Sequence, residues 1–352
     1  VLSVIVSVVM RVISMAFMKP LLILMNTPED IFQDAYKYIM IICAGIFTQV
    51  MYNLLAGILR ALGNSKTPLY FLLFSAALNI VLDLALVYGI RMGIKGAAIA
   101  TVISQIVSGI GICIYTWMKM PELRFSLRPE RIKESQSVMG EVVRYSAASS
   151  IQQSVMNFGI LMIQGLVNSF GTVVMAAFAA AVKIDAFAYL PVQDFGNAFS
   201  IFLAQNYGAQ EKDRLKQGIR GAFAAAAGFS VAVSAVVYGF AAPLMRIFID
   251  AGEVDVIAEG VRYLHIEGAF YLGIGWLFLL YGLYRAVGRP GMSVVLTVIS
   301  LGIRVALAYA LSAIPAVGVV GIWWSVPIGW FLADAVGLGY YWWKRRTLFE
   351  MR

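Results

Sequence analysis

Long apolar runs, separated by short turns rich in Pro, Gly, Asn and Asp, make up almost the whole chain. Each run has about 20 residues or more, the length an α-helix needs to cross the hydrocarbon core of a bilayer. The pattern therefore predicts about ten transmembrane helices and no sheet. They fall at residues 1–25, 31–59, 68–90, 94–118, 140–170, 172–204, 217–248, 256–284, 291–313 and 317–343.

The composition agrees with an integral membrane protein. Hydrophobic residues make up 61% of the 352 residues and charged residues only 13%, whereas soluble domains average about 25% charge. The net charge of +8 is scattered over short loops rather than gathered on one face, which argues against a nucleic-acid partner. Cys43 and Cys113 lie inside apolar runs, and His265 is the one histidine. We therefore expect no metal site, no cofactor and no catalytic centre.

The charged loops predict the orientation in the membrane. Basic residues gather in alternate loops, whereas the loops between them are acidic or uncharged, and only Arg91 and Lys95 break the pattern. Cytoplasmic loops are enriched in Lys and Arg. We therefore expect a multi-pass protein of the cell (plasma or inner) membrane with a cytoplasmic C-terminus. The basic set is Arg60, Lys66, Lys119, Arg124, Arg128, Arg131, Lys133, Lys212, Arg214, Lys216, Arg220, Arg285, Arg289, Lys344, Arg345 and Arg346.

One unit of sequence occurs twice, at an offset of 225 residues. The offset relates a Gly–Arg–Ala–Gly turn and a later pair of glycines in the first half to the same residue types in the second half. The matched pairs are Gly57 and Gly282, Arg60 and Arg285, Ala61 and Ala286, Gly63 and Gly288, Gly93 and Gly318, and Gly96 and Gly321. The repeat predicts two pseudo-symmetric helical lobes.

The repeat also predicts the domain boundaries. An N-terminal lobe covers residues 1–118, a polar cytoplasmic linker residues 119–137, and a C-terminal lobe residues 138–352. The second lobe begins with two helices that have no counterpart ahead of Val1. We therefore expect that the first lobe lacks two helices of a full set of roughly twelve and holds about four.

An acid in the first repeat has no counterpart in the second. Asn79 and Asp83 are four residues apart, hence on one face of one helix. Thr101 lies on the returning helix at a matching depth, roughly 12 Å below the outer turn. A carboxylate, an amide and a hydroxyl suit a proton or a hard cation such as Na⁺. The alternative is that Asp83 snorkels outward or pairs with Arg91 to hold the hairpin.

The helix at 140–170 carries a polar stripe on an otherwise apolar surface. Lipid cannot satisfy amide groups, so the stripe must face a cavity or another helix. It lines a substrate cleft, or it only forms hydrogen bonds between helices. Its members are Ser146, Ser149, Gln153, Asn157, Gln164 and Asn168.

Two further sets of polar residues fall inside predicted spans. Lys183 and Asp185 are two residues apart, so they cannot share a helix face and must find separate partners. Glu267 and Tyr271, four residues apart, could receive a cation together. Both sets are candidates for the substrate cleft, and structural pairing is the alternative for each.

The motifs together resemble the multidrug and toxic compound extrusion (MATE) family over essentially the whole chain. Each motif is weak alone, but the combination is specific. The matching residues are Tyr52, Asn53, Gly57, Arg60, Gly63, Asn64, Lys66, Pro68, Asn79, Asp83, Gly93, Gly96, Thr101 and the stretch 204–209.

The resemblance implies two pseudo-symmetric six-helix lobes with a cleft between them, and export of cationic organic compounds in exchange for H⁺ or Na⁺. Asn79, Asp83 and Thr101 match the N-lobe cation site of the archaeal and DinF-like branches. The NorM-like branch uses C-lobe carboxylates instead, and its glutamate corresponds to Gln153 or Gln152 here. The resemblance therefore favours the DinF-like branch, with coupling through Asp83.

Other functions fit the sequence less well. A flippase for lipid-linked oligosaccharides or precursors on a related fold would line its cleft with basic residues for pyrophosphate, and only Lys183 and Arg304 are candidates. A passive channel would need a symmetric polar ring. We therefore expect a monomeric multidrug antiporter of the bilayer, and not an enzyme.

Overall fold

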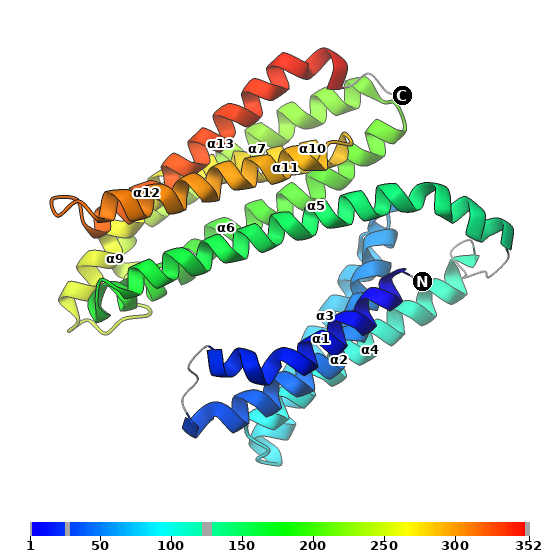
Figure 1. Ribbon diagram of the computed structural model, residues 1–352, viewed down its shortest axis with the longest axis horizontal. Coiled ribbons are helices and arrows are strands. Elements are labelled where there is room, and N and C mark those ends of the chain that lie inside the picture. Colours follow the sequence, from blue (N-terminus) through cyan, green and yellow to red (C-terminus); the bar gives the residue numbers. More distant parts are fainter. Residues whose placement is uncertain (1, 25–28, 122–128, 349–352) are drawn as a thin grey trace. The chain divides into compact units, whose positions relative to one another are not determined.

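The computed structural model of the protein describes residues 2–24, 29–121 and 129–348, and these ranges are helical apart from short turns. The chain divides into two compact units, Val1–Arg131 and Ile132–Arg352 (Figure 1). Each unit is described below by itself.

The first unit contains four long helices. The third continues into a short π-helical segment, η1. The elements are α1 (Leu2–Leu24), α2 (Glu29–Ala61), α3 (Lys66–Asp83), η1 (Leu84–Gly89) and α4 (Ile94–Lys119).

The second unit contains longer helices and more interruptions. A 3₁₀ segment, η3, separates α9 from α10, and a π-helical segment, η4, separates α11 from α12. The elements are α5 (Pro129–Asn168), α6 (Thr172–Gly208), α7 (Lys212–Gly239), α8 (Ala241–Met245), α9 (Val254–Glu267), η3 (Gly268–Phe270), α10 (Tyr271–Ala286), α11 (Pro290–Thr297), η4 (Val298–Gly302), α12 (Ile303–Ser312) and α13 (Val319–Leu348).

The all-helical membrane architecture predicted from the apolar runs is confirmed. In the part of the chain that the structure describes, nine helical segments are long and apolar enough to cross a membrane. The expected tenth, α5, is a helix of 40 residues but is not among the nine. Its polar stripe lowers its hydropathy. The last part of the predicted linker 119–137, from Pro129 onward, is helical and belongs to α5; residues 122–128 of this linker lie outside the described residues.

In the first unit, α2 lies along α4, and α1 and α3 flank the pair (Figure 1). The close approach depends on a glycine. A Cβ atom at Gly109 of α4 would lie 2.9 Å from the carbonyl oxygen of Thr48 on α2. Small residues allow transmembrane helices to pack with their backbones this close. The contact leaves the polar side chains beside it facing the space between α2, α3 and α4.

In the second unit, α10 is the central helix and packs against α6, α7, α11 and α13. It is apolar around its whole circumference, as expected of a helix enclosed by others. Residues 277–284 of α10 are all buried. Next to it, the ring of Trp323 is fully buried and stacks on Phe178 at a centroid distance of 5.6 Å.

The repeat is visible in the backbone. Gly63 has φ +85° and Gly288 has φ +78°, and each follows the end of a helix. The amide after each glycine donates to a carbonyl five residues earlier, from Asn64 to Leu59 at 2.8 Å and from Arg289 to Tyr284 at 2.8 Å. This is the Schellman arrangement, which needs a left-handed residue that glycine adopts without steric cost.

Candidate functional site

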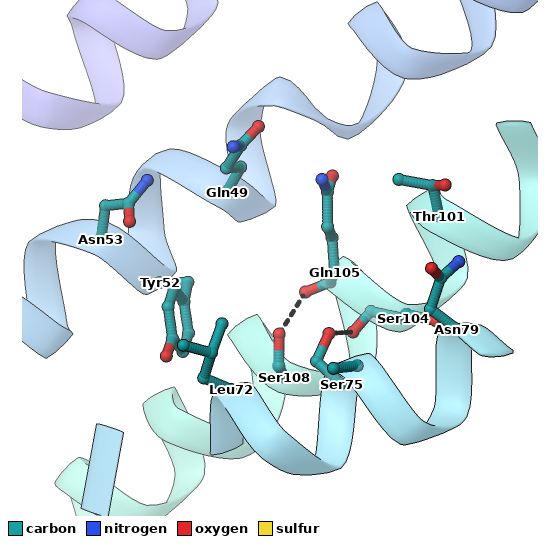
Figure 2. Close-up of a pocket in the computed structure, with 11 residues that line it drawn as sticks. Gln49, Tyr52, Asn53, Leu72, Ser75, Asn79, Thr101, Ser104, Gln105 and Ser108 are labelled. Atoms are coloured by element: carbon teal, nitrogen blue, oxygen red, sulfur yellow. Dashed lines mark hydrogen bonds between the residues drawn. The ribbon is translucent and has the colours of Figure 1, made fainter. Parts of the chain in front are cut away.

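The first unit contains a polar cavity of about 290 Å³ among α2, α3 and α4 (Figure 2). It lies within membrane-spanning segments, where the surrounding lipid offers amide and hydroxyl groups no hydrogen-bond partner. Its lining residues are Gln49, Tyr52, Asn53, Leu72, Ser75, Ala76, Asn79, Thr101, Ser104, Gln105 and Ser108.

Two of the three residues predicted for a cation site line this cavity. Asn79 comes from α3 and Thr101 from α4, and Figure 2 shows them on the same side of it. The Thr101 hydroxyl donates to the Ala97 carbonyl at 3.0 Å, so its lone pairs stay available to a ligand. The Asn79 amide nitrogen is buried and has no acceptor among the described residues.

Asp83 does not line the cavity; it lies one turn beyond Asn79, where α3 passes into η1. Its Oδ1 is buried and has no donor among the described residues. No ion pair joins Asp83 to Arg91 in the described part of the chain. Arg91 is exposed, in a left-handed turn with φ +60°. The hairpin-brace alternative therefore lacks the contact that it needs.

The remaining polar lining residues were not predicted for the cation site, although Tyr52 and Asn53 are among those that carry the family resemblance. Gln49 and Asn53 come from α2, and the side chain of Gln105 extends from α4 alongside Thr101 (Figure 2). The Gln105 Oε1 atom is buried without a donor among the described residues. The spacing of Gln49 and Asn53, four residues apart in an apolar run, was the available signal.

The second unit contains a smaller cavity, of about 210 Å³, that encloses two acids and an arginine. Aromatic and aliphatic side chains form most of its wall. Its lining residues are Ile160, Phe178, Val182, Asp185, Ala186, Tyr189, Leu190, Tyr263, Glu267, Tyr271, Ile274, Arg304 and Trp330.

Asp185 is held in this cavity by two tyrosines. Tyr263 donates to its Oδ2 at 2.6 Å, and Tyr271 donates a short hydrogen bond to its Oδ1. Glu267 is also buried, and its Oε2 has no donor among the described residues. Tyr271, expected to act with Glu267, thus bonds to Asp185 instead.

A helix break lies among these side chains. Helix α9 ends at Glu267, η3 turns through three residues, and α10 begins at Tyr271. A 3₁₀ turn advances by about 3.0 residues per turn instead of 3.6, so it rotates the following residues relative to those before it. Tyr263, Glu267 and Tyr271 follow one another at intervals of four residues, the spacing of one helix face, and they line one cavity across the break.

The other predicted cleft residues lie elsewhere. Lys183 is exposed, and its Nζ lies 5.5 Å from the centroid of the Phe248 ring. On α5, Gln153 donates to Asn157 at 3.4 Å and Gln164 donates to Asn168 at 2.9 Å. These four pair along their own helix, and none lines the cavity that holds Asp185.

Comparison with known proteins gives consistent matches. A family model described as MatE matches residues 1–85 and 146–310. The protein named "Probable multidrug resistance protein YpnP" of Bacillus subtilis (strain 168) is 31% identical over 334 residues, which cover 94% of this chain and 73% of that protein. "Probable multidrug resistance protein YoeA" of the same organism is 28% identical over 349 residues, which cover 97% and 75%.

The fold has solved counterparts. The structure described as the outward-facing conformation of a multidrug resistance MATE family transporter of the MOP superfamily aligns with a TM-score of 0.89. The alignment covers 99% of this chain and 77% of that one, at 22% identity. At this identity the likeness concerns the fold.

Proposed function

Because the chain belongs to the MatE family of multi-pass membrane transporters, we propose that it is a secondary active antiporter that exports cationic organic compounds in exchange for H⁺ or Na⁺. Its relatives carry the name of multidrug resistance proteins, which supports efflux as the direction of transport. We propose that it works in the cell membrane with its C-terminus in the cytoplasm.

The observation that carries the coupling proposal is a pair of unsatisfied polar atoms in a membrane span. Asn79 Nδ2 and Asp83 Oδ1 are both buried in the segment Lys66–Gly89 and have no partners among the described residues. Ionisable groups inside a membrane span are costly and usually functional. A proton or Na⁺ at Asp83, next to the cavity lined by Asn79 and Thr101, would relieve that cost. This is the N-lobe coupling of the DinF-like branch.

The cavity of the second unit suits the cationic part of a transported compound. Asp185 and Glu267 outnumber Arg304 there, and the wall is largely apolar and aromatic. Small-molecule sites combine such walls with a few oriented polar groups, and aromatic faces attract organic cations. Coupling requires that the ion and the compound favour different conformations of the protein.

The arrangement of basic residues does not favour the flippase alternative. Of its two candidates, Arg304 lines the cavity whereas Lys183 is exposed and lies against Phe248. A pyrophosphate group would need several cations converging on one site. Within the described residues, the cavity has one cation and two acids.

Efflux of ethidium or norfloxacin from cells expressing the full-length protein tests the proposal, with Na⁺ and pH varied separately. Asp83→Asn should abolish ion-driven efflux while the protein still reaches the membrane. Asp213→Asn, which changes an exposed acid in the first turn of α7 in the same way, is the matched control and should transport normally. Normal efflux by Asp83→Asn would refute coupling through Asp83. If the wild type exports no cationic dye, cationic multidrug efflux is wrong.

A further inference from the structure

A third buried acid lies in the C-terminal unit, outside the cavity that contains Asp185 and Glu267. Asp334 is on α13, within a membrane-spanning segment, and only 4% of its surface is exposed. Neither of its carboxyl oxygens has a hydrogen-bond partner among the described residues. The mechanism proposed above gives this acid no role.

Hydroxyl groups from α10 and α11 lie in the same buried region, but most of their protons are already used. Ser293 donates to the carbonyl of Tyr281 at 3.0 Å, and Thr297 donates to the carbonyl of Ser293 at 2.9 Å. The Tyr281 side chain interacts with Thr297 and Ser300. The hydroxyl protons of Ser293 and Thr297 are therefore donated to backbone carbonyls. These two hydroxyls cannot stabilise a carboxylate at Asp334 by donating to it.

Tyr281, on α10, is the titratable group that interacts electrostatically with Asp334. Other titratable groups on elements packed against α13 bond to partners other than Asp334, although the Nε atom of Arg285 has no partner among the described residues. From α10, Tyr284 donates to the Gly337 carbonyl and Arg285 to Asn197 Oδ1. From α9, Glu259 accepts from Trp323 Nε1.

The remaining charged neighbour, Arg304 of α12, lines the cavity of Asp185 and Glu267 instead. Its Cβ faces Gly329, more than one helical turn before Asp334 along α13. No ion pair joins Asp334 to a cation in the described part of the chain.

The backbone of α10 passes close to α13 beside Asp334. A Cβ atom at Gly273 of α10 would lie 3.1 Å from the Cβ of Trp330, a tight contact, and 3.8 Å from Asp334 Oδ2, an ordinary one. The π-helical segment η4 packs against α13. Such segments are frequent at functional sites.

We propose that Asp334 is a proton-binding site of the C-terminal unit, additional to Asp83, which takes up and releases its proton during the transport cycle. An ionised carboxylate without donors is strongly unfavourable at this depth, whereas a protonated one carries no charge. A metal cation would need several converging oxygen ligands, and no second acid faces Asp334 among the described residues. The part that concerns transport rests on the antiport function proposed above.

Infrared difference spectra between high and low pH test the proposal on the full-length protein reconstituted in lipid vesicles. The measurement reports on a protonated buried carboxyl group and does not depend on efflux. The wild type and Asp83→Asn should both show a carbonyl-stretch band from Asp334. The band should be lost in Asp334→Asn and retained in the matched control Asp213→Asn.

A spectrum of Asp334→Asn identical to that of the wild type would overturn the proposal. If Asp334→Asn does not fold, Asp334→Glu replaces it; the longer side chain should shift the band, and an unshifted band would also overturn the assignment. Proton counting separates this proposal from the antiport function. If the wild type releases a proton that depends on Asp334 but exports no compound, the site stands and the antiport function fails.

Discussion

Tyr263 donates a hydrogen bond of 2.6 Å to Oδ2 of Asp185, across 78 residues of sequence. The bond joins α9 to α6 in the interior of the C-terminal unit, and Tyr271 reaches the other oxygen of the same carboxyl group from beyond the helix break. The carboxyl group of Asp185 is therefore satisfied by two tyrosine hydroxyl groups. Among the described residues, no cation forms a hydrogen bond with it.

Replacing Tyr263 by Phe should destabilise the protein. The ring contacts with Phe178 and Trp323 would remain, but Oδ2 of Asp185 would lose its donor while still buried. Leaving a buried polar atom unsatisfied costs about 1–3 kcal/mol. Thermal unfolding in detergent should show a lower midpoint than for Tyr238→Phe, which changes an exposed tyrosine. Equal midpoints would contradict this role for the hydroxyl.

The two repeat-related glycines should respond alike to substitution. Gly63→Ala and Gly288→Ala would each force a side chain into a left-handed conformation, at a cost of about 1–2 kcal/mol. Space is not the cause at Gly63, where a Cβ atom would meet nothing within 4 Å. Gly57→Ala, in the interior of α2 and equally open, is the control and should stabilise the protein by about 0.5–1 kcal/mol. Thermal unfolding of the three variants measures these changes in stability. A higher unfolding midpoint for Gly63→Ala than for the wild type would contradict the prediction.

Thr101→Val should weaken ion coupling without weakening the fold. Valine has nearly the same shape, and the lost hydrogen bond to the Ala97 carbonyl is local to α4. Loss of one oxygen ligand worth about 1.4 kcal/mol raises the ion concentration for half-maximal efflux roughly tenfold. Dye efflux at graded Na⁺ and pH provides the measurement. Ser108→Ala, about two helical turns along α4 from Thr101 and farther from Asn79 in Figure 2, should change this ion concentration less.

Glu267→Gln should lower the affinity for cationic compounds more than for neutral ones. The substitution removes one negative charge from the cavity with little change in volume, so only charged compounds lose attraction. We expect roughly a tenfold weaker Kd for a cationic dye, equivalent to about 1.4 kcal/mol. Glu253→Gln, in an exposed turn, is the control. Equal losses for cationic and neutral compounds would place the substrate elsewhere.

Much of the fold could be predicted from local pattern. The apolar runs predict where helices lie because a membrane helix must hide its backbone over a fixed thickness. The offset of 225 residues predicts the paired turns at Gly63 and Gly288, because a left-handed residue at a helix end needs glycine. The break between Glu267 and Tyr271 could not be predicted. Its sequence contains no proline, and packing around α10 decides its geometry.

For the candidate sites, too, one part could be predicted from the sequence and another part could not. Unusual residues in apolar runs identify Asp83, Asp185 and Glu267, because the cost of a charge in lipid makes each conspicuous. Their partners remained open, however. Asp185 bonds to tyrosines 78 and 86 residues away, and Lys183, its neighbour in sequence, lies against Phe248.

The sequence by itself thus determined the membrane class, the helices, the repeat and the acids that demand an explanation. Only the tertiary structure decided which side chains meet: that Asn79 and Thr101 share a cavity with Gln105, and that Asp334 remains without a donor. The physical reason is that helical periodicity assigns each residue to a face of its own helix, whereas the packing of several helices decides which faces come together.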